Sequence, residues 1–308
     1  MDAGTELDRR RELAELYRLE RVATWTLLPV AAAFAAATFQ TRSVTVLALT
    51  LEFTASCVAG FFQLYALRQA VRANAFSFPY GAGKFEDFAR FLRGALYVPS
   101  ALIVAYWAIT RLIWPFDVGY AEAIVVVALS LGRALLLLEW KRRLMASSPE
   151  PSERLRDAYR VRRSLTLNSA FIVVVLGIGL ALEEDGLLGL GERADAIMAL
   201  LIVWYMIQDG AKTAVRHFNA LVDRPLPRAQ REALERVLAA HAGECGGVQG
   251  VYTRASGHER FVDIDLRFAD DCSLAAAEQV GARIRAELEE ALGDTHVRLY
   301  VAAGEAGS

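Results

Sequence analysis

Six long apolar segments constrain this chain more than any other feature of its sequence. A helix that crosses a bilayer needs about 20 mainly apolar residues. Six stretches approach that length: 22–40, 44–66, 94–113, 120–138, 164–182 and 194–214. The composition agrees, since 55% of the 308 residues are hydrophobic and 23% are charged. We therefore expect a multi-pass membrane protein, which largely excludes a soluble enzyme.

The linkers between these segments predict their arrangement and orientation. Only the turn at 41–43 separates the first two segments, so sequence neighbours should form antiparallel pairs. Basic residues gather on alternate linkers: five precede the first segment, five lie in 68–93 and eight lie in 141–163. The positive-inside rule then places both termini in the cytoplasm. Residues 1–21 lack the apolar core of a signal peptide and are expected to form a charged cytoplasmic helix.

The chain changes character after the sixth segment. Prolines and charges interrupt the apolar pattern, and we expect a linker over about 215–228. Beyond it, 229–240 and 274–292 have the spacing of amphipathic helices. The segment 260–268 alternates strictly between polar and apolar residues, and 296–301 is also typical of a strand. The order predicted for this part is helix, strand, strand, helix, strand.

Two domains follow from these patterns. The first is an all-α, six-helix transmembrane bundle in 22–214, and the second is a C-terminal cytoplasmic α+β domain in 215–308. The order of elements in the second domain favours a ferredoxin-like fold with both helices on one face of the sheet. The chain has three cysteines and no Cys-x-x-Cys pair, which excludes a disulfide framework and a zinc ribbon.

Distinctive motifs stand in residues 41–60, 78–89 and 193–210. Together these three segments resemble the cation diffusion facilitator family. Residues 41–60 (TRSVTVLALTLEFTASCVAG) look like its second helix, which carries two metal-ligand positions four residues apart. Residues 78–89 (FPYGAGKFEDFA) are similar to its Tyr-Gly-His-Gly-Lys-x-Glu loop, and 193–210 followed by LVDRPLP resembles its sixth helix and domain junction. The resemblance covers nearly the whole chain. It implies a homodimeric exporter that moves Zn²⁺, Mn²⁺, Fe²⁺ or similar ions out of the cytosol in exchange for protons.

The resemblance also implies where the transported ion binds. The family's site is tetrahedral and takes Asp or His side chains at i and i+4 from the second and fifth helices, a spacing that puts both on one helix face. Carried over to this chain, the second-helix positions fall on Glu52 and Ser56. In the fifth helix, Ser164 and Asn168 preserve the spacing.

This site has fewer metal-binding side chains than the site of the family. A shift of one residue in the fifth helix gives Leu165 and Ser169, and neither alignment supplies a carboxylate or an imidazole. All four histidines lie outside the apolar segments, so a zinc site with several His and Asp ligands is excluded. Glu52 with hydroxyl and amide oxygens favours a hard cation such as Mn²⁺, Mg²⁺ or Fe²⁺, and makes Glu52 the natural proton carrier.

Peripheral metal sites lose their ligands as well. Ala82 stands where the family has the histidine of its loop. The histidines of metal-sensing members are replaced in this chain by Tyr252, Asp265, Glu278 and Tyr300. Asp263 and Asp265 together offer a weak cytoplasmic site for a hard cation, although a solvated strand face is the plainer interpretation.

Two ion pairs are predicted from the topology. Lys84 and Asp223 both fall at the cytoplasmic boundary of the membrane, where we expect them to pair at the base of the bundle. Arg133 lies deep within the fourth segment, and an arginine at that depth needs a partner. We expect its guanidinium to approach Glu52 and to supply the positive charge that a bound metal ion supplies in active relatives. The alternative is that Arg133 binds water or the region of Asp209.

Two functions remain open from the sequence, and the first of them is the leading hypothesis. The first is a proton-coupled divalent cation exporter of altered selectivity, in a plasma or bacterial inner membrane. The second is a family member that does not transport and acts as a regulatory or assembly partner. One carboxylate is few for a dication in a medium of low dielectric, which makes the second function a serious alternative. The expected partners are membrane lipid, a second copy of the chain and a divalent metal ion, with no nucleic acid and no resident cofactor.

Overall fold

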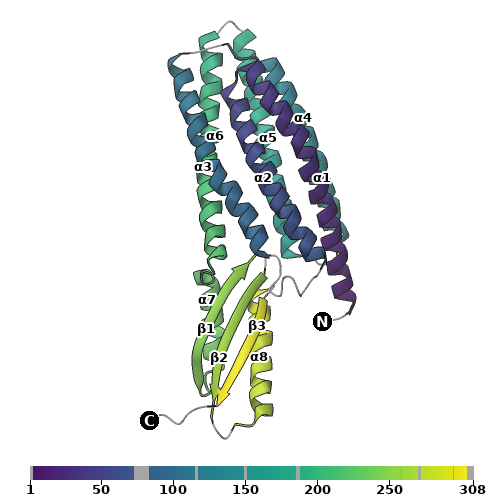
Figure 1. The fold of residues 1–308 in the computed structure, drawn as a ribbon, viewed down its shortest axis with the longest axis vertical. Coiled ribbons are helices and arrows are strands. Elements are labelled where there is room, and N and C mark those ends of the chain that lie inside the picture. Colours follow the sequence, from purple (N-terminus) through teal and green to yellow (C-terminus); the bar gives the residue numbers. More distant parts are fainter. Residues whose placement is uncertain are drawn as a thin grey trace. The chain divides into compact units, whose positions relative to one another are not determined.

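The computed structural model describes residues 3–72, 83–114, 117–148, 151–184, 188–257, 259–269, 272–293 and 295–303. The chain divides into two compact units, Met1–His217 and Phe218–Ser308 (Figure 1). Each unit has its own hydrophobic core.

Six long helices form the described part of the first unit and run side by side (Figure 1). They are α1 (Ala3–Thr41), α2 (Val44–Arg72), α3 (Gly83–Ile113), α4 (Tyr120–Ser147), α5 (Glu153–Glu184) and α6 (Leu188–Leu221), the last of which extends beyond this unit. All six are long and apolar enough to cross a membrane. The predicted bundle is therefore confirmed. The charged segment 1–21 is not a separate helix, because α1 continues from it into the first apolar segment without a break.

The turn between α1 and α2 is held by a side chain from a distant helix. Arg42 adopts a left-handed backbone conformation with φ 53°, which lets the chain reverse within two residues. Ser43 then donates its hydroxyl to Asp195 of α6 at 2.6 Å. The backbone N–H groups of Val44 and Thr45 donate to the same carboxylate at 2.8 and 3.3 Å. The N-terminus of α2 is thus capped by a carboxylate from α6.

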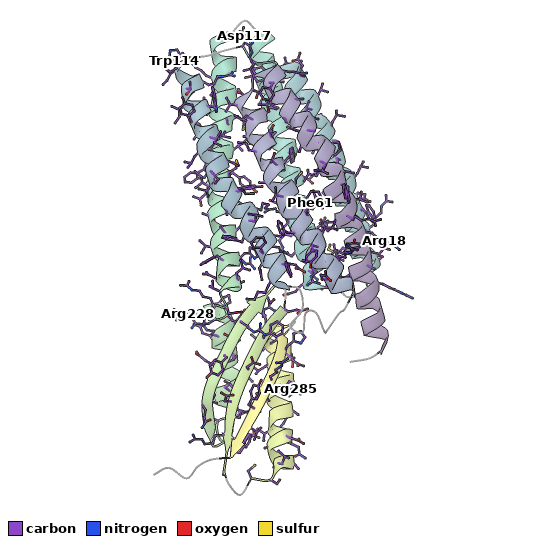
Figure 2. All side chains as sticks on the ribbon, in the orientation of Figure 1. Arg18, Phe61, Trp114, Asp117, Arg228 and Arg285 are labelled. Atoms are coloured by element: carbon purple, nitrogen blue, oxygen red, sulfur yellow. The ribbon has the colours of Figure 1, made fainter. Side chains whose placement is uncertain are left out.

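The surface of the bundle suits a lipid environment. Large apolar side chains such as Leu129, Leu136 and Trp204 are exposed on the outside of the helices, where a soluble protein would carry charge. Figure 2 shows Trp114 and Asp117 at one end of the bundle, with Arg18 toward the other. Tryptophan beside charged residues is typical of the boundary between membrane and water.

The second unit is a small α+β domain. Its elements are α7 (Arg228–Ala240), β1 (Gly247–Ser256), β2 (Glu259–Phe268), α8 (Leu274–Leu292) and β3 (Thr295–Ala303). The three strands lie in the order β1-β2-β3, with β1 antiparallel and β3 parallel to β2. A parallel neighbour needs a crossover, which α8 supplies. This order confirms the predicted helix, strand, strand, helix, strand.

The alternation in β2 separates the core of this domain from its open face. Val262, Ile264 and Leu266 are completely buried and pack with residues of α7 and α8. Asp263 and Asp265 point to the opposite face, because successive side chains of a strand alternate.

Candidate functional site

Glu52 is the centre of a polar site inside the helix bundle. It lies on α2 and is 5% exposed. The hydroxyl of Tyr97 on α3, itself completely enclosed, donates to Oε1 of Glu52 at 3.2 Å. The same tyrosine also contacts the side chain of Ser56, one turn along α2. The two second-helix positions suggested by the family resemblance thus meet around one phenol group.

A basic residue balances this carboxylate, and it is not the one that we expected. Arg93 lies one turn from Tyr97 on α3, where its charge acts on Glu52. Its Nη2 atom lies 3.7 Å from Oδ2 of Asp209 on α6. Its Cζ atom lies 5.7 Å from the centre of the Tyr97 ring, within range of a cation–π contact. Arg93 therefore pairs with Asp209 of α6 and lies against the tyrosine that donates to Glu52 of α2.

Three helices contribute to this site with the same spacing. We name it the membrane polar cluster and define it by the pairs Glu52 and Ser56 of α2, Arg93 and Tyr97 of α3, and Tyr205 and Asp209 of α6. Tyr205 interacts electrostatically with Asp209, Glu52 and Arg93. Each pair is separated by four residues, so both of its members lie on one face of their helix.

A close crossing of two helices fixes the geometry of the cluster. A Cβ atom on Gly94 would lie 2.7 Å from both the carbonyl oxygen of Gly210 and the backbone nitrogen of Ala214. The backbones of α3 and α6 are therefore in direct contact at this point. Gly94 follows Arg93 and Gly210 follows Asp209, so the crossing sets the separation of these two charged residues.

Arg133 does not pair with Glu52, and this prediction is corrected. Its Nη1 atom donates to the carbonyl oxygen of Ala23 and to the hydroxyl of Thr26, both on α1 and both at 3.2 Å. The reason is the direction in which the residue faces, because α4 packs against α1 and α5. The predicted contact rested on axial height alone, and height does not determine which neighbour a side chain meets.

The fifth-helix positions are not joined to Glu52 by a hydrogen bond in the described part of the chain. Ser164 is exposed and Asn168 is half-buried on α5. The neighbouring Thr166 and Ser169 donate their hydroxyls to carbonyl oxygens of their own helix, at 2.9 and 3.1 Å. No three Asp, Glu, His or Cys side chains of the described residues are grouped as metal ligands. The assignment of Ser164 and Asn168 as ligands stays a prediction.

The other predicted positions are spread over the chain. Asp263 pairs across the sheet with Tyr252 and Arg298, and Asp265 pairs with Tyr300. A basic residue thus lies on the strand next to Asp263, and a cation site at these two aspartates stays a prediction. Ala82 lies outside the described residues. Lys84 and Asp223 belong to different units, so their ion pair also stays a prediction.

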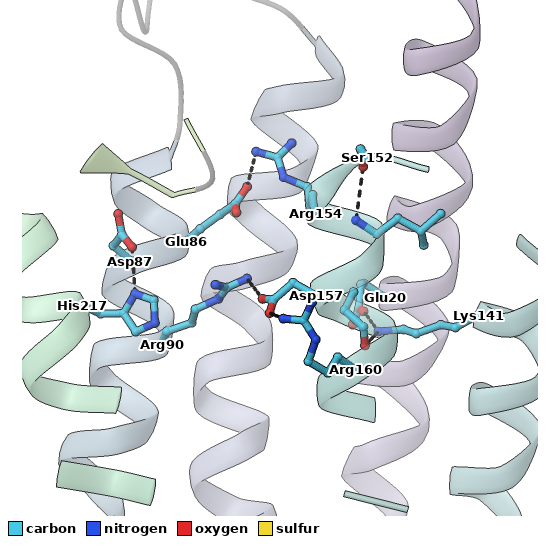
Figure 3. A network of polar contacts seen from close by, with 12 residues as sticks. Glu20, Glu86, Asp87, Arg90, Lys141, Ser152, Arg154, Asp157, Arg160 and His217 are labelled. Carbon is cyan, nitrogen blue, oxygen red and sulfur yellow. Dashed lines mark hydrogen bonds and ion pairs between the residues drawn. The ribbon is translucent and has the colours of Figure 1, made fainter. Parts of the chain in front are cut away.

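Ion pairs connect the helices at the end of the bundle where α3 begins (Figure 3). The pairs are Glu20 with Lys141 at 2.5 Å, Glu86 with Arg154 at 2.9 Å, Asp87 with His217 at 2.8 Å and Arg90 with Asp157 at 3.4 Å. They join α1 to α4, and α3 to α5 and α6. Because each charge has a partner of the opposite sign or a histidine, this end tolerates a high density of buried charge.

Comparisons with known proteins agree with this architecture. Residues 21–222 match the model of the cation efflux transmembrane domain, and residues 226–301 match that of the cation efflux protein cytoplasmic domain. The cation-efflux pump FieF of Shewanella oneidensis is 28% identical over 256 residues, which cover 81% of this chain and 82% of the relative. The pumps of the same name from Cronobacter sakazakii and Serratia proteamaculans are each 27% identical, covering 79% and 81% of this chain and 78% and 80% of the relatives. The chain is therefore a multi-pass membrane protein that belongs to the cation efflux family.

Proposed function

We propose that this protein exports a divalent cation from the cytosol in exchange for protons, and that Glu52 carries out the exchange. The observation that supports this best is the burial of Glu52 within the bundle with a neutral hydroxyl as its direct hydrogen-bond donor. A carboxylate in a membrane helix is costly and is usually functional. Cation-efflux pumps named FieF match about four fifths of the chain, which supports the same activity.

Glu52 differs from the other buried carboxylates of the described helices in its partners. The others are each held by a basic side chain or by the N-terminus of a helix. They are Glu86 with Arg154, Asp87 with His217, Asp195 at the start of α2, and Glu12 with Ser152 just before α5. A carboxylate already bound in this way is poorly placed to accept a proton or a metal ion. Glu52 is the best placed to do both.

The donors around Glu52 favour a hard cation. The described side chains of the membrane polar cluster offer carboxylate, phenol and hydroxyl oxygens, and no sulfur or imidazole. Oxygen ligands of this kind suit Mn²⁺, Mg²⁺ or Fe²⁺ better than Zn²⁺. We therefore propose selectivity for Mn²⁺ or Fe²⁺ over Zn²⁺.

We further propose that the exporter is a homodimer with both termini in the cytoplasm. The match of residues 226–301 to the family's cytoplasmic domain supports a partner for this part, and the open face of its single sheet needs one. The distribution of Lys and Arg supports the orientation. The ion pair of Lys84 and Asp223 is part of this proposal, and a double-mutant cycle without coupling between the two residues would remove it.

Transport by purified protein in liposomes tests the main proposal. Mn²⁺ entry is followed with a dye inside the vesicles, with and without a pH gradient. Glu52→Gln should abolish transport, whereas Ser56→Ala should reduce it less, because Glu52 supplies both the charge and the proton. Glu139→Gln is the matched control, since this glutamate is part-exposed on α4 and pairs with Arg143 of the same helix. Undiminished transport by Glu52→Gln would exclude Glu52 as the carrier.

A protein that does not transport is the second candidate, and the charge of Arg93 favours it. Arg93 forms its ion pair with Asp209, but its positive charge also acts on Glu52 and so opposes the binding of a dication there. In this case wild-type vesicles would show no Mn²⁺, Fe²⁺ or Zn²⁺ flux above that of empty vesicles. Such a protein would act as a regulatory or assembly partner.

A further inference from the structure

We propose that Arg93 is a resident cation that competes with the transported ion for Glu52 and Asp209 and thereby sets the affinity of the site. The inference rests on the proposed function, because it concerns the ion that the membrane polar cluster receives. It assigns to Asp209 the role of a second carboxylate of that cluster. Neither residue was among the ligand positions suggested by the family resemblance.

The contacts of Arg93 lie within this cluster. Its guanidinium is 3.7 Å from the Asp209 carboxylate and 5.7 Å from the centre of the Tyr97 ring, whose hydroxyl donates to Glu52. The acids that begin the same helix have other partners, since Glu86 pairs with Arg154 and Asp87 pairs with His217. Arg93 is therefore held by Asp209 and by the Tyr97 ring, within the cluster that contains Glu52.

The charges of the cluster explain why this arginine must oppose a metal ion. Glu52 and Asp209 together carry two negative charges when both are ionised, which would neutralise one dication. With Arg93 paired to Asp209 in the same cluster, a bound dication leaves an excess positive charge in a medium of low dielectric, which is unfavourable. The ion must therefore displace the guanidinium from at least one carboxylate.

The backbone cannot relieve this competition, although the side chain can. The crossing at Gly94 and Gly210 holds α3 against α6, so Arg93 cannot leave Asp209 by a shift of its helix. The Arg93 side chain is 24% exposed and that of Asp209 is 34% exposed, so the guanidinium has room to rotate away from the carboxylate. Arg93 is thus positioned to give way to a metal ion and to return after its release.

Metal binding by the purified full-length protein tests this inference directly. Mn²⁺ is titrated calorimetrically into wild type and Arg93→Gln in detergent. Removing the competing charge should tighten Mn²⁺ binding by about tenfold or more, the change that corresponds to roughly one ion pair of moderate strength. Arg93→Lys keeps the charge and should stay within about threefold of wild type. Arg90→Gln is the matched control, because Arg90 lies one turn earlier on α3 and pairs with Asp157 of α5.

Two further variants make the result specific to the cluster. Glu52→Gln in the Arg93→Gln background should abolish the gain in affinity. Asp209→Asn alone should weaken Mn²⁺ binding by about tenfold, because Arg93 is then directed entirely to Glu52. This second measurement does not depend on whether Arg93→Gln folds.

The outcomes separate this inference from the proposed function. Tighter binding in Arg93→Gln supports the inference even if wild-type protein transports nothing. Equal affinity in folded Arg93→Gln and wild type overturns it, even if wild-type protein transports Mn²⁺. Unchanged affinity in Asp209→Asn overturns it as well, and a gain in Arg90→Gln equal to that in Arg93→Gln would show a general charge effect instead.

Discussion

Asp195 of α6 should be among the most important single residues for the stability of the bundle. The first backbone N–H groups of a helix have no partner within the helix. In α2, the N–H groups of Val44 and Thr45 donate to Asp195, and that of Val46 donates to the hydroxyl of Ser43. Asp195 is 2% exposed, so water cannot replace its carboxylate if it is removed.

The geometry gives the size of the expected effect. The two short hydrogen bonds to this carboxylate, from Ser43 at 2.6 Å and Val44 at 2.8 Å, are charge-assisted. Such bonds contribute roughly 1.5–3 kcal/mol each, and their buried donors are left unpaired when the acceptor is deleted. We expect Asp195→Ala to lower the free energy of unfolding by about 3–5 kcal/mol. Asp195→Asn keeps one acceptor oxygen and should lose about half as much.

Unfolding of the purified protein in mixed micelles measures this effect. The loss of helix is followed by circular dichroism while the fraction of SDS is raised. Asp117→Ala is the control, because Asp117 is exposed in the loop before α4. Hydrogen exchange should also become faster at the N–H groups of Val44 and Thr45. A loss below about 1 kcal/mol in Asp195→Ala, with protection at these amides retained, would refute the capping role.

Three further predictions concern backbone geometry and a thiol group. Gly94→Ala should destabilise the bundle by about 1–3 kcal/mol, because the new Cβ would meet the backbone of α6. Gly132→Ala is the control and should be neutral or stabilising by up to about 1 kcal/mol, since nothing lies within 4 Å of a Cβ at that position. Equal effects of the two substitutions in thermal unfolding would contradict this prediction. Arg42→Val should cost about 1–2 kcal/mol in the same assay and Arg42→Gly much less, because φ is 53° at this residue. Burial, and secondarily the charge of the adjacent glutamate, raises the pKa of the Cys245 thiol. Near pH 8, Cys245 should therefore react with a thiol reagent more slowly than Cys272 until denaturant is added. The stability that the buried neutral thiol of Cys245 contributes should be lost as pH rises through its raised pKa.

The fold could be predicted largely from periodicity. Helices and strands bury one face, so apolar residues recur at regular intervals along the chain. This regularity gives the six apolar segments, and it gives the alternation in β2 of buried Val262, Ile264 and Leu266 with Asp263 and Asp265. The continuity of α1 was missed because a change from charged to apolar residues does not end a helix. Without a glycine or a capping residue, the helix continues through the boundary.

The candidate site could be predicted only in part, because it depends on which helices meet. Glu52 was identified, since a carboxylate in an apolar segment stands out. Arg93 was missed because the third segment was predicted to begin at residue 94, which placed the arginine in a loop as a topology signal. Helix α3 in fact begins at Gly83, so Arg93 lies well inside it. The four-residue spacing of Arg93 with Tyr97, and of Tyr205 with Asp209, was the available signal.

The close crossing of α3 and α6 also has a kinetic consequence. Because residue 94 has no side chain, the backbones of the two helices are in direct contact. We therefore expect α3 and α6 to move together as one rigid body. The motion that remains available to Arg93 is rotation about its own side-chain bonds, which is faster than helix movements on the scale of microseconds to milliseconds. The local exchange of guanidinium for metal ion should therefore remain at equilibrium throughout a transport cycle, and the slower rearrangement of the helices should determine the turnover number.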